Sequence, residues 1–595
     1  MKWVLAEGDR AAVAVLSENG FHPLVARLLV NRGITDPAAA RLFLAADLSH
    51  LSPASIFSGM ERAVGRIQRA LADREKIVVY GDYDVDGVTG ASLLYLVLRD
   101  LGADVGHYIP DRISEGYGLN TRALETIRAT GAGLVITVDC GISAMRESEA
   151  ARSLGLDLII TDHHEIAQPD VPAPGTATPA SLPETALPDA FAILHPWLLA
   201  PDTAPDVRER VKGLTGVGVA FKLAQALLKT DAHDERMQSC LDLVTLGTIA
   251  DVGRITGENR VFVKHGLDRL SRGDNTVRPG VAALKEVAGL AGKRISAGNV
   301  GFALAPRINA SGRLERADMA FRLLTTESPK EALTIASALD EVNKERQTVE
   351  GLIQEDARRL CREQDLASIG AFVLASPDWH PGVIGIVASR IVEEFYRPTA
   401  LVCVRDGVGK GSARSIPGFD LYHGLLQCGD LLLGFGGHKY AAGFTIAEER
   451  IPEFRERLSS LVRDAMGNDG FLRTQIVDEA ITLDELSLDL LREIDRLAPF
   501  GQGNPEPRLG TRGLSVVSSR IVGNNHLKLR LKQENGTALD AIAFNRGRLL
   551  GKQVRDGERL AIVFTPRANS WNGNTAVELE IRDFKKDRVG HGSKN

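Results

Sequence analysis

The 595-residue sequence has few cysteines and no long apolar run. Its five cysteines are scattered and form no CxxC pair, which argues against a disulfide framework and a structural zinc site and fits a reducing compartment. No stretch reaches the roughly 18 apolar residues of a membrane span. The opening segment, MKWVLAEGDR, has no sustained apolar core. We therefore expect a cytoplasmic protein with no membrane partner.

A strong excess of one charge is also absent. The chain has 71 Lys and Arg residues against 77 Asp and Glu residues, a formal net charge of −6, so its overall charge does not favour an anionic partner. Any surface for nucleic acid must therefore be local. Hydrophobic residues make up 44% and charged residues 25% of the chain, as in ordinary globular proteins, and the length allows three or four domains.

Short apolar runs alternate with helical stretches from residue 76 onward, which predicts a parallel sheet built from βα units. The runs at 77–80, 134–138 and 158–160 each end in a polar cluster. A second α/β pattern begins at residue 371. The charged, amphipathic stretch at about 328–364 predicts a helix that connects two lobes.

Five short runs with alternating hydrophobicity after about residue 475 predict a small β-barrel. Residues 165–190 are rich in Pro, Ala and Thr and predict a flexible insertion in the first lobe. The expected fold is thus α/β, with a parallel-sheet lobe, a long helix, a second α/β lobe and a C-terminal barrel. The expected domains are an N-terminal helical cap (1–55), a first lobe (56–325), a connecting helix (326–366), a second lobe (367–468) and a barrel domain (469–595).

The segment GDYDVDG, residues 81–87, follows the first apolar run and places Asp82, Asp84 and Asp86 at alternating positions in a turn bounded by glycines. Such dense negative charge is tolerable only if cations neutralise it, so the segment indicates a metal site. The alternative is a solvated acidic turn.

The next two apolar runs end at Asp139 and at Asp162-His163-His164. Ligands gather beyond the carboxyl ends of parallel strands, so these segments can converge on one crevice. Carboxylates with imidazole, and without thiolates, suit Mn²⁺ or Mg²⁺ rather than structural zinc. The alternative for Asp162 is a helix cap followed by surface histidines, and Asp251, after the apolar run LVTLGTIA, taken alone is also expected to be a cap.

The motifs GDYDVDG, VDCG, DHH and GTIADV occur in an order that resembles the DHH phosphoesterase superfamily. Over roughly residues 50–585 the chain is similar to the single-strand-specific 5′ to 3′ exonucleases of that superfamily. The resemblance implies a DHH lobe joined by a long helix to a DHHA1 lobe, an OB-fold, and two divalent ions, Mn²⁺ or Mg²⁺. The implied metal ligands are Asp84, Asp86, Asp139, His163 and Asp251, with Asp82 as a further candidate, and the implied catalytic residues are His164, Asp139 and Asp84.

Phosphate contacts are expected from four further segments: IPDR, PRINASGR, GSARS and GFGGHKYAAG. Guanidinium groups suit phosphate, and glycines let backbone amides approach it. In the family, the segments GSARS and GFGGHKYAAG recognise the 5′ phosphate end. Arg112, taken without the resemblance, is equally compatible with a surface arginine. The segment GVGKGS lacks the spacing of a P-loop, so ATP is not implied. The candidates are Arg112, Arg307, Asn309, Arg313, Ser412, Arg414, Ser415 and His438.

The predicted barrel is locally basic. Residues 511–586 contain 14 Lys and Arg residues against seven Asp and Glu residues, a local charge of +7, and Lys528, Arg530 and Lys532 alternate along one strand. Alternation places the three on one face, where they would track a single-stranded backbone while an aromatic such as Trp571 stacks on a base. The alternative is a solubilising basic face.

The resemblance implies a monomeric exonuclease that degrades single-stranded DNA from the 5′ end to 5′-mononucleotides in DNA repair and recombination. A single-strand-binding protein and a helicase are candidate partners. One rival function is hydrolysis of short oligonucleotides or cyclic dinucleotides, by relatives that share the two lobes but lack the barrel. A second rival is a non-catalytic replication scaffold, although every acidic and histidine position of the motifs is intact.

Overall fold

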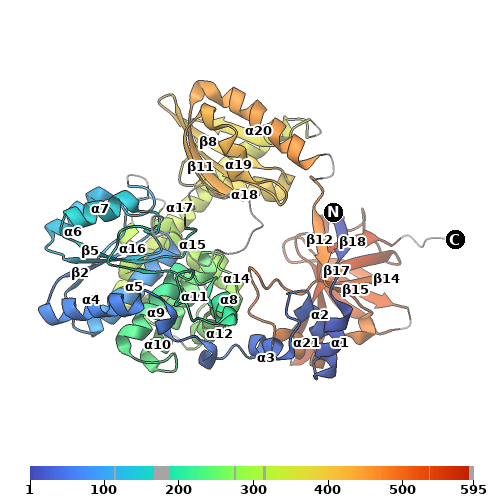
Figure 1. Cartoon of the computed structure of the whole chain (residues 1–595). Helices are drawn as coiled ribbons and strands as arrows, with labels where there is room; N and C mark the ends of the chain where they lie inside the picture. Colours follow the sequence, from blue (N-terminus) through green and yellow to red (C-terminus); the bar gives the residue numbers. More distant parts are fainter. Residues whose placement is uncertain are drawn as a thin grey trace.

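The computed structural model describes residues 1–112, 115–166, 187–273, 276–312, 317–366, 368–467, 470–534, 536–571 and 573–587; the side chains of Ala317 and Trp571 are outside the description. Most of the expected insertion, residues 167–186, also lies outside it. The chain forms two α/β lobes connected by one long helix, with a β-barrel beside them (Figure 1). The predicted architecture is thereby confirmed.

The first lobe is built on a five-stranded, fully parallel sheet with strand order β3-β2-β4-β5-β6. Helices α6 and α7 pack on one face, and α4 and α5 on the other. Because both faces are covered, the central strands are apolar runs without alternation. The elements are β2 (Ile77–Gly81), β3 (Val105–Tyr108), β4 (Leu134–Val138), β5 (Asp157–Thr161), β6 (Ala192–Leu194), α4 (Met60–Asp73), α5 (Val85–Asp100), α6 (Thr121–Ala129) and α7 (Met145–Ser153).

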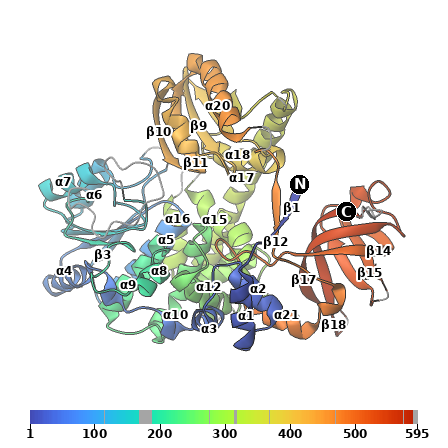
Figure 2. The same cartoon turned by 45° about the vertical axis from the view of Figure 1, so that its right-hand side comes forward.

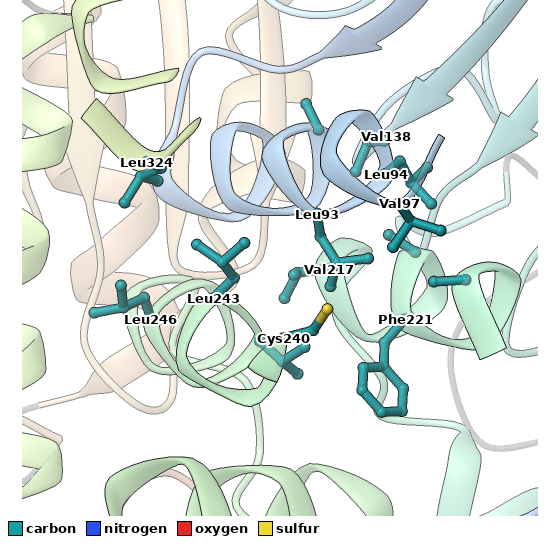
Figure 3. Close-up of a cluster of buried hydrophobic side chains, with 14 of the residues drawn as sticks. Leu93, Leu94, Val97, Val138, Val217, Phe221, Cys240, Leu243, Leu246 and Leu324 are labelled. Atoms are coloured by element: carbon teal, nitrogen blue, oxygen red, sulfur yellow. The ribbon is translucent and has the colours of Figure 1, made fainter. Parts of the chain in front are cut away.

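An all-helical layer covers the outer side of α5. Helix α5 is buried around nearly its whole circumference because α9 and α11 pack against the side that faces away from the sheet (Figure 3). Leu93, Val217 and Leu243 meet in this core. The helices are α8 (Pro205–Val211), α9 (Gly216–Leu228), α10 (Glu235–Ser239), α11 (Leu241–Ala250), α12 (Gly257–Leu270), α13 (Pro279–Val287), α14 (Ala297–Asn299), a π-helical turn (Val300–Leu304), α15 (Ala305–Ser311) and α16 (Ala317–Thr325).

The connecting helix α17 (Pro329–Arg362) leads from this layer into the second lobe (Figure 2). That lobe has a five-stranded sheet with order β10-β11-β9-β8-β7, in which only the pair β7–β8 is parallel. Its elements are β7 (Phe372–Ser376), β8 (Thr399–Arg405), β9 (Val408–Arg414), β10 (Leu432–His438), β11 (Ala441–Ala447), α18 (Ile384–Phe395), α19 (Leu421–Leu426) and α20 (Ile451–Met466).

The C-terminal sheet closes into a barrel because β14 pairs with both β15 and β17. All five expected barrel strands are present, and the first, fourth and fifth are longer than the sequence pattern indicates. The elements are β13 (Glu479–Ala480), β14 (Leu509–Val522), β15 (His526–Gln533), β16 (Leu539–Ala543), β17 (Arg559–Trp571), β18 (Asn574–Lys586) and α21 (Leu488–Asp495).

The N-terminal segment packs on the barrel, almost 500 residues away in the sequence. Strand β1 (Lys2–Leu5) pairs in parallel with β12 (Thr474–Val477). Helices α1 (Arg10–Glu18), α2 (Pro23–Val30) and α3 (Pro37–Ala45) bury their apolar residues in one core with the barrel strands and α21. The expected helical cap therefore begins with a strand, and it belongs to the hydrophobic core of the barrel.

A buried arginine of the first lobe joins that lobe to the barrel and the N-terminal helices. Arg260, on α12, is 1% exposed, and its guanidinium group lies 3.9 Å from the ring centre of Phe43. It donates hydrogen bonds to the carbonyl oxygen of Phe43 and to four carbonyls that follow α21, those of Arg496, Leu497, Ala498 and Pro499. No carboxylate forms an ion pair with it among the described residues, and burial, followed by the charge of Arg32, lowers its pKa to about 9.

The same face of α12 holds the end of α3 at two more points. Lys264 donates a hydrogen bond to the carbonyl of Ala45, and His265 bonds the carbonyl of Ala46. Carbonyls at helix C-termini lack partners within the helix, and cations are favoured there. Three basic side chains on one helix face thus fix two C-terminal helix ends to the first lobe.

The described helices contain no single segment long and apolar enough to cross a membrane, and only the pair α8 and α9, bent by 118°, reaches that length and composition together.

The substitution Arg260→Met should loosen the barrel and the N-terminal helices from the first lobe, because it removes one donor from each of five carbonyls, and only those of Leu497 and Pro499 keep another, from Asn504. We expect the free energy of unfolding to fall by about 3 kcal/mol, the usual cost of removing one partner from a buried charged network. Calorimetric unfolding measures the loss, and limited proteolysis in the connection at 46–59 measures the loosening. The variant Arg272→Met, which changes an exposed arginine, is the control. Equal unfolding free energies and equal proteolysis rates for the two variants would contradict the role of Arg260 in joining the first lobe to the barrel.

Candidate metal centre

The acidic turn lies between β2 and α5, at the carboxyl end of the sheet. Helix α5 begins at Val85, inside the motif. Asp84 is its N-cap: its Oδ1 accepts from the amides of Asp86 at 2.8 Å and Gly87 at 3.1 Å. Asp82 is 1% exposed. A solvated acidic turn is therefore excluded.

Asp86 is fully buried and faces the N-terminus of α9. Its two carboxylate oxygens accept from the amides of Gly216 at 2.7 Å and Val217 at 3.0 Å, an arrangement favoured by the positive end of the helix dipole. The helices approach closely here, since a Cβ on Gly247 of α11 would lie 2.8 Å from Asp86 Oδ1. Burial and neighbouring Asp84 nevertheless raise the pKa of Asp86 to about 7.

Asp139 follows β4 in the left-handed backbone region, with φ of 64°. A conformation so unusual for a side-chain-bearing residue stores strain, which is commonly found at functional sites. A Cβ on Gly216 would lie 2.6 Å from the Asp139 Cβ, so only glycine lets α9 pack here. Burial, and then the charge of Asp86, raises the pKa of Asp139 well above its usual range.

Asp162 holds the two histidines rather than lying at the protein surface. Its carboxylate accepts from the amides of Ile142, His163 and His164 and from His164 Nδ1. Burial opposes ionisation, but the hydrogen bond and charge of His164 lower the pKa of Asp162 to about 2. Asp162 is thus an ionised positioning residue. His195, the residue before Pro196, supports the same loop through Nε2, which lies 2.9 Å from the carbonyl oxygen of His164.

His163 points into the carboxylates. Its Nε2 lies 3.0 Å from Asp139 Oδ1, 3.7 Å from Asp86 Oδ2 and 3.8 Å from Asp251 Oδ2. Burial, and then the charge of His164, lowers the pKa of His163 to about 3, so its ring is neutral. Asp251 is the C-cap of α11, as expected from its position, but it also joins this cluster, and burial and Asp86 raise its pKa.

The side chains form two separate groups of three. Asp86, His163 and Asp251 make one and Asp82, Asp84 and Asp139 the other, and within each group the ligand atoms lie within 4.8 Å of one another. A third combination, of Asp139, His163 and His164, overlaps the two groups.

Three buried atoms at the centre have no hydrogen-bond partner among the described residues: Asp82 Oδ1, Asp139 Oδ1 and His163 Nε2, the last two facing each other at 3.0 Å. Buried polar atoms are normally paired, and carboxylate oxygens with a neutral imidazole nitrogen are ligands of Mn²⁺ and Mg²⁺. Burial and the charge of Asp84 also raise the pKa of Asp82 well above its usual range. The donor set therefore fits two divalent cations, which would neutralise the crowded carboxylates.

His164 lies beside the two groups, and the sequence gives no direct sign of its aromatic partner. The hydroxyl of Tyr117 is 3.0 Å from His164 Nδ1 and also donates to the carbonyl of Asp139 at 3.2 Å. Burial opposes protonation of His164, but Asp162 outweighs it and raises the pKa of His164 to about 9. The only sequence signal for Tyr117 is its place in the glycine-flanked segment GYG shortly after Arg112.

Two arginines from different lobes lie near each other beside this centre. Arg112 stacks over the ring of Tyr83 in the acidic turn, with 4.8 Å to the ring centre. Burial, and then the charge of Arg112, lowers the pKa of Arg414. Neither arginine has an ion-pair partner in the described part of the chain. Arg414 instead donates to Ser412 Oγ at 3.2 Å and to the carbonyl of Ala413 at 2.8 Å, neither of which compensates its charge.

The other predicted phosphate contacts are placed differently. Arg307 is bound to Asp340 of the connecting helix at 2.8 Å, so its charge is compensated. Ser415 donates to the carbonyl of Phe419. His438 ends β10 and is exposed, and Asn309 lies on α15 at the junction with α17. Arg313 is outside the described residues.

On the barrel, Lys528, Arg530 and Lys532 do share the outer face of β15, alternating with buried Leu527, Leu529 and Leu531. Lys528 is held by Glu578 and Asp540, so its charge is already balanced. Arg530 is exposed and has no ion-pair partner within the described residues. Trp571 ends β17, and its side chain is not described.

Three family models match the chain along its length. Residues 76–248 match the DHH family, N-terminal domain; residues 368–464 match the DHHA1 domain; and residues 477–583 match the RecJ OB domain. Fold and site thus define a two-lobed phosphoesterase of the DHH–DHHA1 class with an added OB-fold.

Similarity to individual proteins narrows this class. The chain is 41% identical over 592 residues to the single-stranded-DNA-specific exonuclease RecJ of Bacillus subtilis (strain 168), a match that covers 98% of this chain and 70% of that relative. The chain belongs to the RecJ family. The resemblance seen in the motifs is therefore confirmed.

Solved structures agree. RecJ from Thermus thermophilus in complex with Mn²⁺ matches with a TM-score of 0.79 and 31% identity, covering 99% of this chain and 80% of that chain. The same protein in complex with Mg²⁺ matches with a TM-score of 0.74 and 31% identity, covering 99% and 79%. The two expected metals are the ones found with this relative.

Binding of Mn²⁺ should release protons, because carboxyl groups with raised pKa values must ionise before they coordinate a cation. Asp86, with a pKa of about 7, is protonated below that pH and ionised above it. The affinity should thus rise between pH 6 and pH 8, approaching about tenfold per pH unit for each proton released. Calorimetric titration in buffers of different ionisation enthalpy counts the protons.

The variant Asp139→Asn is the control for this titration, because it keeps the shape of the side chain and removes one ligand charge. Its Mn²⁺ affinity should be at least about tenfold lower. A binding enthalpy independent of the buffer, with equal affinity at pH 6 and pH 8, would contradict the assignment.

Proposed function

We propose that this chain is a metal-dependent exonuclease that degrades single-stranded DNA from the 5′ end and releases 5′-mononucleotides. The observation that carries the proposal is the pair of three-ligand groups around His163, with three buried atoms that have no hydrogen-bond partner in the described part of the chain. The printed name of the Bacillus subtilis relative, a single-stranded-DNA-specific exonuclease, supports the substrate.

The two groups of ligands favour hydrolysis assisted by two ions. When bound, divalent cations would supply a water of lowered pKa and stabilise negative charge on the scissile phosphate. Asp84, Asp86, Asp139, His163 and Asp251 would hold them, with Asp82 completing the all-carboxylate group. Asp162 keeps His163 oriented through the backbone amide that it binds.

His164 is suited to act on the phosphate. Its pKa of about 9 keeps the imidazolium charged at neutral pH, and Asp162 and Tyr117 both contact its Nδ1 and so orient the ring. A charged imidazolium beside the reacting phosphate can donate a hydrogen bond to an oxygen on which charge develops. Asp162 remains ionised through this step because its own pKa is about 2.

Arg112 and Arg414 supply a reason for attack at a chain end. Two guanidinium groups from opposite lobes, close together and without carboxylate partners among the described residues, favour a ligand of high negative charge between them. A terminal phosphate carries more charge than an internal one. Ser412, bound to Arg414, adds a further hydroxyl to this candidate anchor for the 5′ phosphate.

The barrel would guide the rest of the strand. Arg530 and, on the neighbouring strand, Arg520 are exposed on its outer side, and Lys532 is partly exposed. Such charges track a phosphate backbone without reading sequence. Lys528 contributes less because it is bound to Glu578.

In this proposal the protein is a cytoplasmic monomer that acts in DNA repair and recombination. The strand would come from a helicase or from a single-strand-binding protein. The first rival function, hydrolysis of short oligonucleotides or cyclic dinucleotides, does not explain the basic barrel. The second, a non-catalytic scaffold, does not explain six intact metal-ligand candidates.

We expect purified protein with Mn²⁺ to shorten a 5′-phosphorylated single strand stepwise from its 5′ end and to leave the matching duplex whole. Strands labelled at either end, alone or annealed to a complement, with Mn²⁺ or Mg²⁺, test polarity, strand preference and metal in one gel series. A 5′ label should appear at once as mononucleotide, and a 3′ label should appear in progressively shorter strands.

The variant Asp139→Ala is the control, and it should bind the strand while cleaving it at least about 1,000-fold more slowly, because it loses a ligand of the metal centre. Cleavage by this variant at the wild-type rate would refute the site. Activity confined to dinucleotides and trinucleotides would favour the phosphodiesterase, and strand binding without any cleavage would favour the scaffold.

A further inference from the structure

Phe302 is more exposed than any other large apolar side chain among the described residues, at 88%. Exposure of a phenylalanine costs the free energy of its burial, which is about 1.5–3 kcal/mol. The cause is local. Phe302 lies in the π-helical turn Val300–Leu304, where the amide of Ala305 bonds the carbonyl of Val300 five residues earlier. The neighbours Val300 and Leu304 are buried, and Phe302 is turned outward.

The exposed ring lines a cavity of about 450 Å³ at the junction of the lobes. One wall is the π-helical turn with α15, the second is α17, and the third is α18 of the second lobe. The volume is in the range of small-ligand sites. π-Helical turns occur frequently at functional sites, so the turn favours a binding role for the cavity.

The floor of the cavity carries net positive charge. Glu350, 5% exposed, accepts from Arg346 at 2.6 Å and from Arg390 at 2.5 Å. Arg346 is 7% exposed and also donates to Asn343. Two guanidinium groups against one carboxylate leave one positive charge, and half of the Arg390 side chain is open to solvent. This built network favours an anionic ligand over a neutral one.

Amide side chains complete the walls. Asn309, Gln347 and Gln354 line the cavity, and none makes a side-chain hydrogen bond within the described parts of the chain. Each amide offers both donors and an acceptor. A planar ligand with mixed donors and acceptors on its edge, an aromatic face and an attached negative charge matches the ring, the amides and Arg390 together. A nucleotide has these three features.

The cavity lies within reach of the metal centre. Phe302 and Gly312 are ten residues apart along one helical path, a distance of about 15 Å. A Cβ on Gly312 would lie 2.9 Å from the carbonyl oxygen of Tyr83 in the acidic turn. Stacked nucleotides are spaced by about 3.4 Å along a strand, so about four nucleotides span the gap.

The other side of the cavity adjoins the candidate phosphate anchor. Gly385 of α18 directly precedes the cavity-lining Ile386, and a Cβ on Gly385 would lie 2.8 Å from Ser412 Oγ and 3.1 Å from an Arg414 nitrogen. The cavity thus adjoins the candidate phosphate anchor and lies about four nucleotides from the metal centre.

We propose that this cavity is a nucleobase subsite, in which Phe302 stacks on one base among the first five nucleotides of the bound strand. Asn309, Gln347 and Gln354 contact the edge of that base, and Arg390 contacts its phosphate. Any base can stack on a phenyl ring and form hydrogen bonds with amides that both donate and accept. The subsite therefore binds the strand without selecting a sequence. This inference rests on the proposed exonuclease function.

The test combines a change in the protein with a change in the substrate. Full-length wild type, Phe302→Ala and Phe302→Trp are compared on a 5′-phosphorylated 12-nucleotide strand that is intact or has a single abasic site at positions one to five. Stacking on one base contributes a factor of about 10 to 100 in affinity. Phe302→Ala should raise KM on the intact strand by about tenfold or more with kcat nearly unchanged, and Phe302→Trp should restore KM.

The decisive result is position-specific. At one abasic position the wild type should lose the same factor, and Phe302→Ala should lose nothing more. Leu333→Ala, which removes an exposed apolar side chain of α17 more than three turns from the cavity, should match the wild type on every strand. An unchanged KM for Phe302→Ala, or an equal loss at all five positions, would overturn the subsite.

Binding separates this outcome from failure of the proposed function. Fluorescence anisotropy of the same strands, measured in the Asp139→Ala background, needs no cleavage. If the wild type cleaves nothing but the coupling between Phe302→Ala and one abasic position appears in the affinities, the subsite stands and the exonuclease proposal falls. If cleavage occurs and the coupling is absent from both readouts, the reverse holds.

Discussion

Crowding of negative charge at the carboxyl end of the first sheet is the constraint on which the rest of the structure depends. Asp82, Asp86 and Asp139 are buried together, and burial raises the pKa of each because an ionised group there has lost its water. The fold provides helix α9, whose amides bind Asp86, and glycines that let three helices and two strand ends approach closely. Among the described residues the only charged cation in contact with the cluster is the His164 imidazolium, which is too little to neutralise these carboxylates, so divalent cations would supply the remaining positive charge.

The placement of charged side chains also explains how a chain of net charge −6 is suited to DNA. Several basic side chains have structural roles. Arg307 binds Asp340 of the connecting helix, Lys528 binds Glu578 within the barrel, and Arg260 joins the first lobe to the barrel and the N-terminal helices. Arg112 has no ion-pair partner among the described residues and lies over Tyr83 of the acidic turn, and Arg414, also without such a partner there, is coupled to Arg112 by charge. Position, rather than total charge, thus distinguishes the basic groups available to a phosphate.

Much of this could be predicted from local sequence. Apolar runs that end in polar clusters predicted β2, β4 and β5, the three inner strands of the first sheet, and the convergence of Asp139 and His163, because parallel strands share one carboxyl edge. Features that depend on contacts far apart in the sequence could not be predicted. The ion pair of Arg307 with Asp340 and the hydrogen bond of Tyr117 to His164 have no local pattern. The packing of the N-terminal helices on the barrel likewise appears only when amphipathic faces nearly 500 residues apart are brought together.

The most direct measurement of the central claim is anomalous scattering from crystals grown with Mn²⁺. The account predicts two peaks about 3.5–4 Å apart, one among Asp86, His163 and Asp251 and the other among the remaining carboxylates of the cluster. The oxygen of Asp139 nearest His163 Nε2, now 3.0 Å from it, should lie against an ion. Absence of manganese from this cluster at saturating concentration, or peaks only elsewhere on the molecule, would contradict the account.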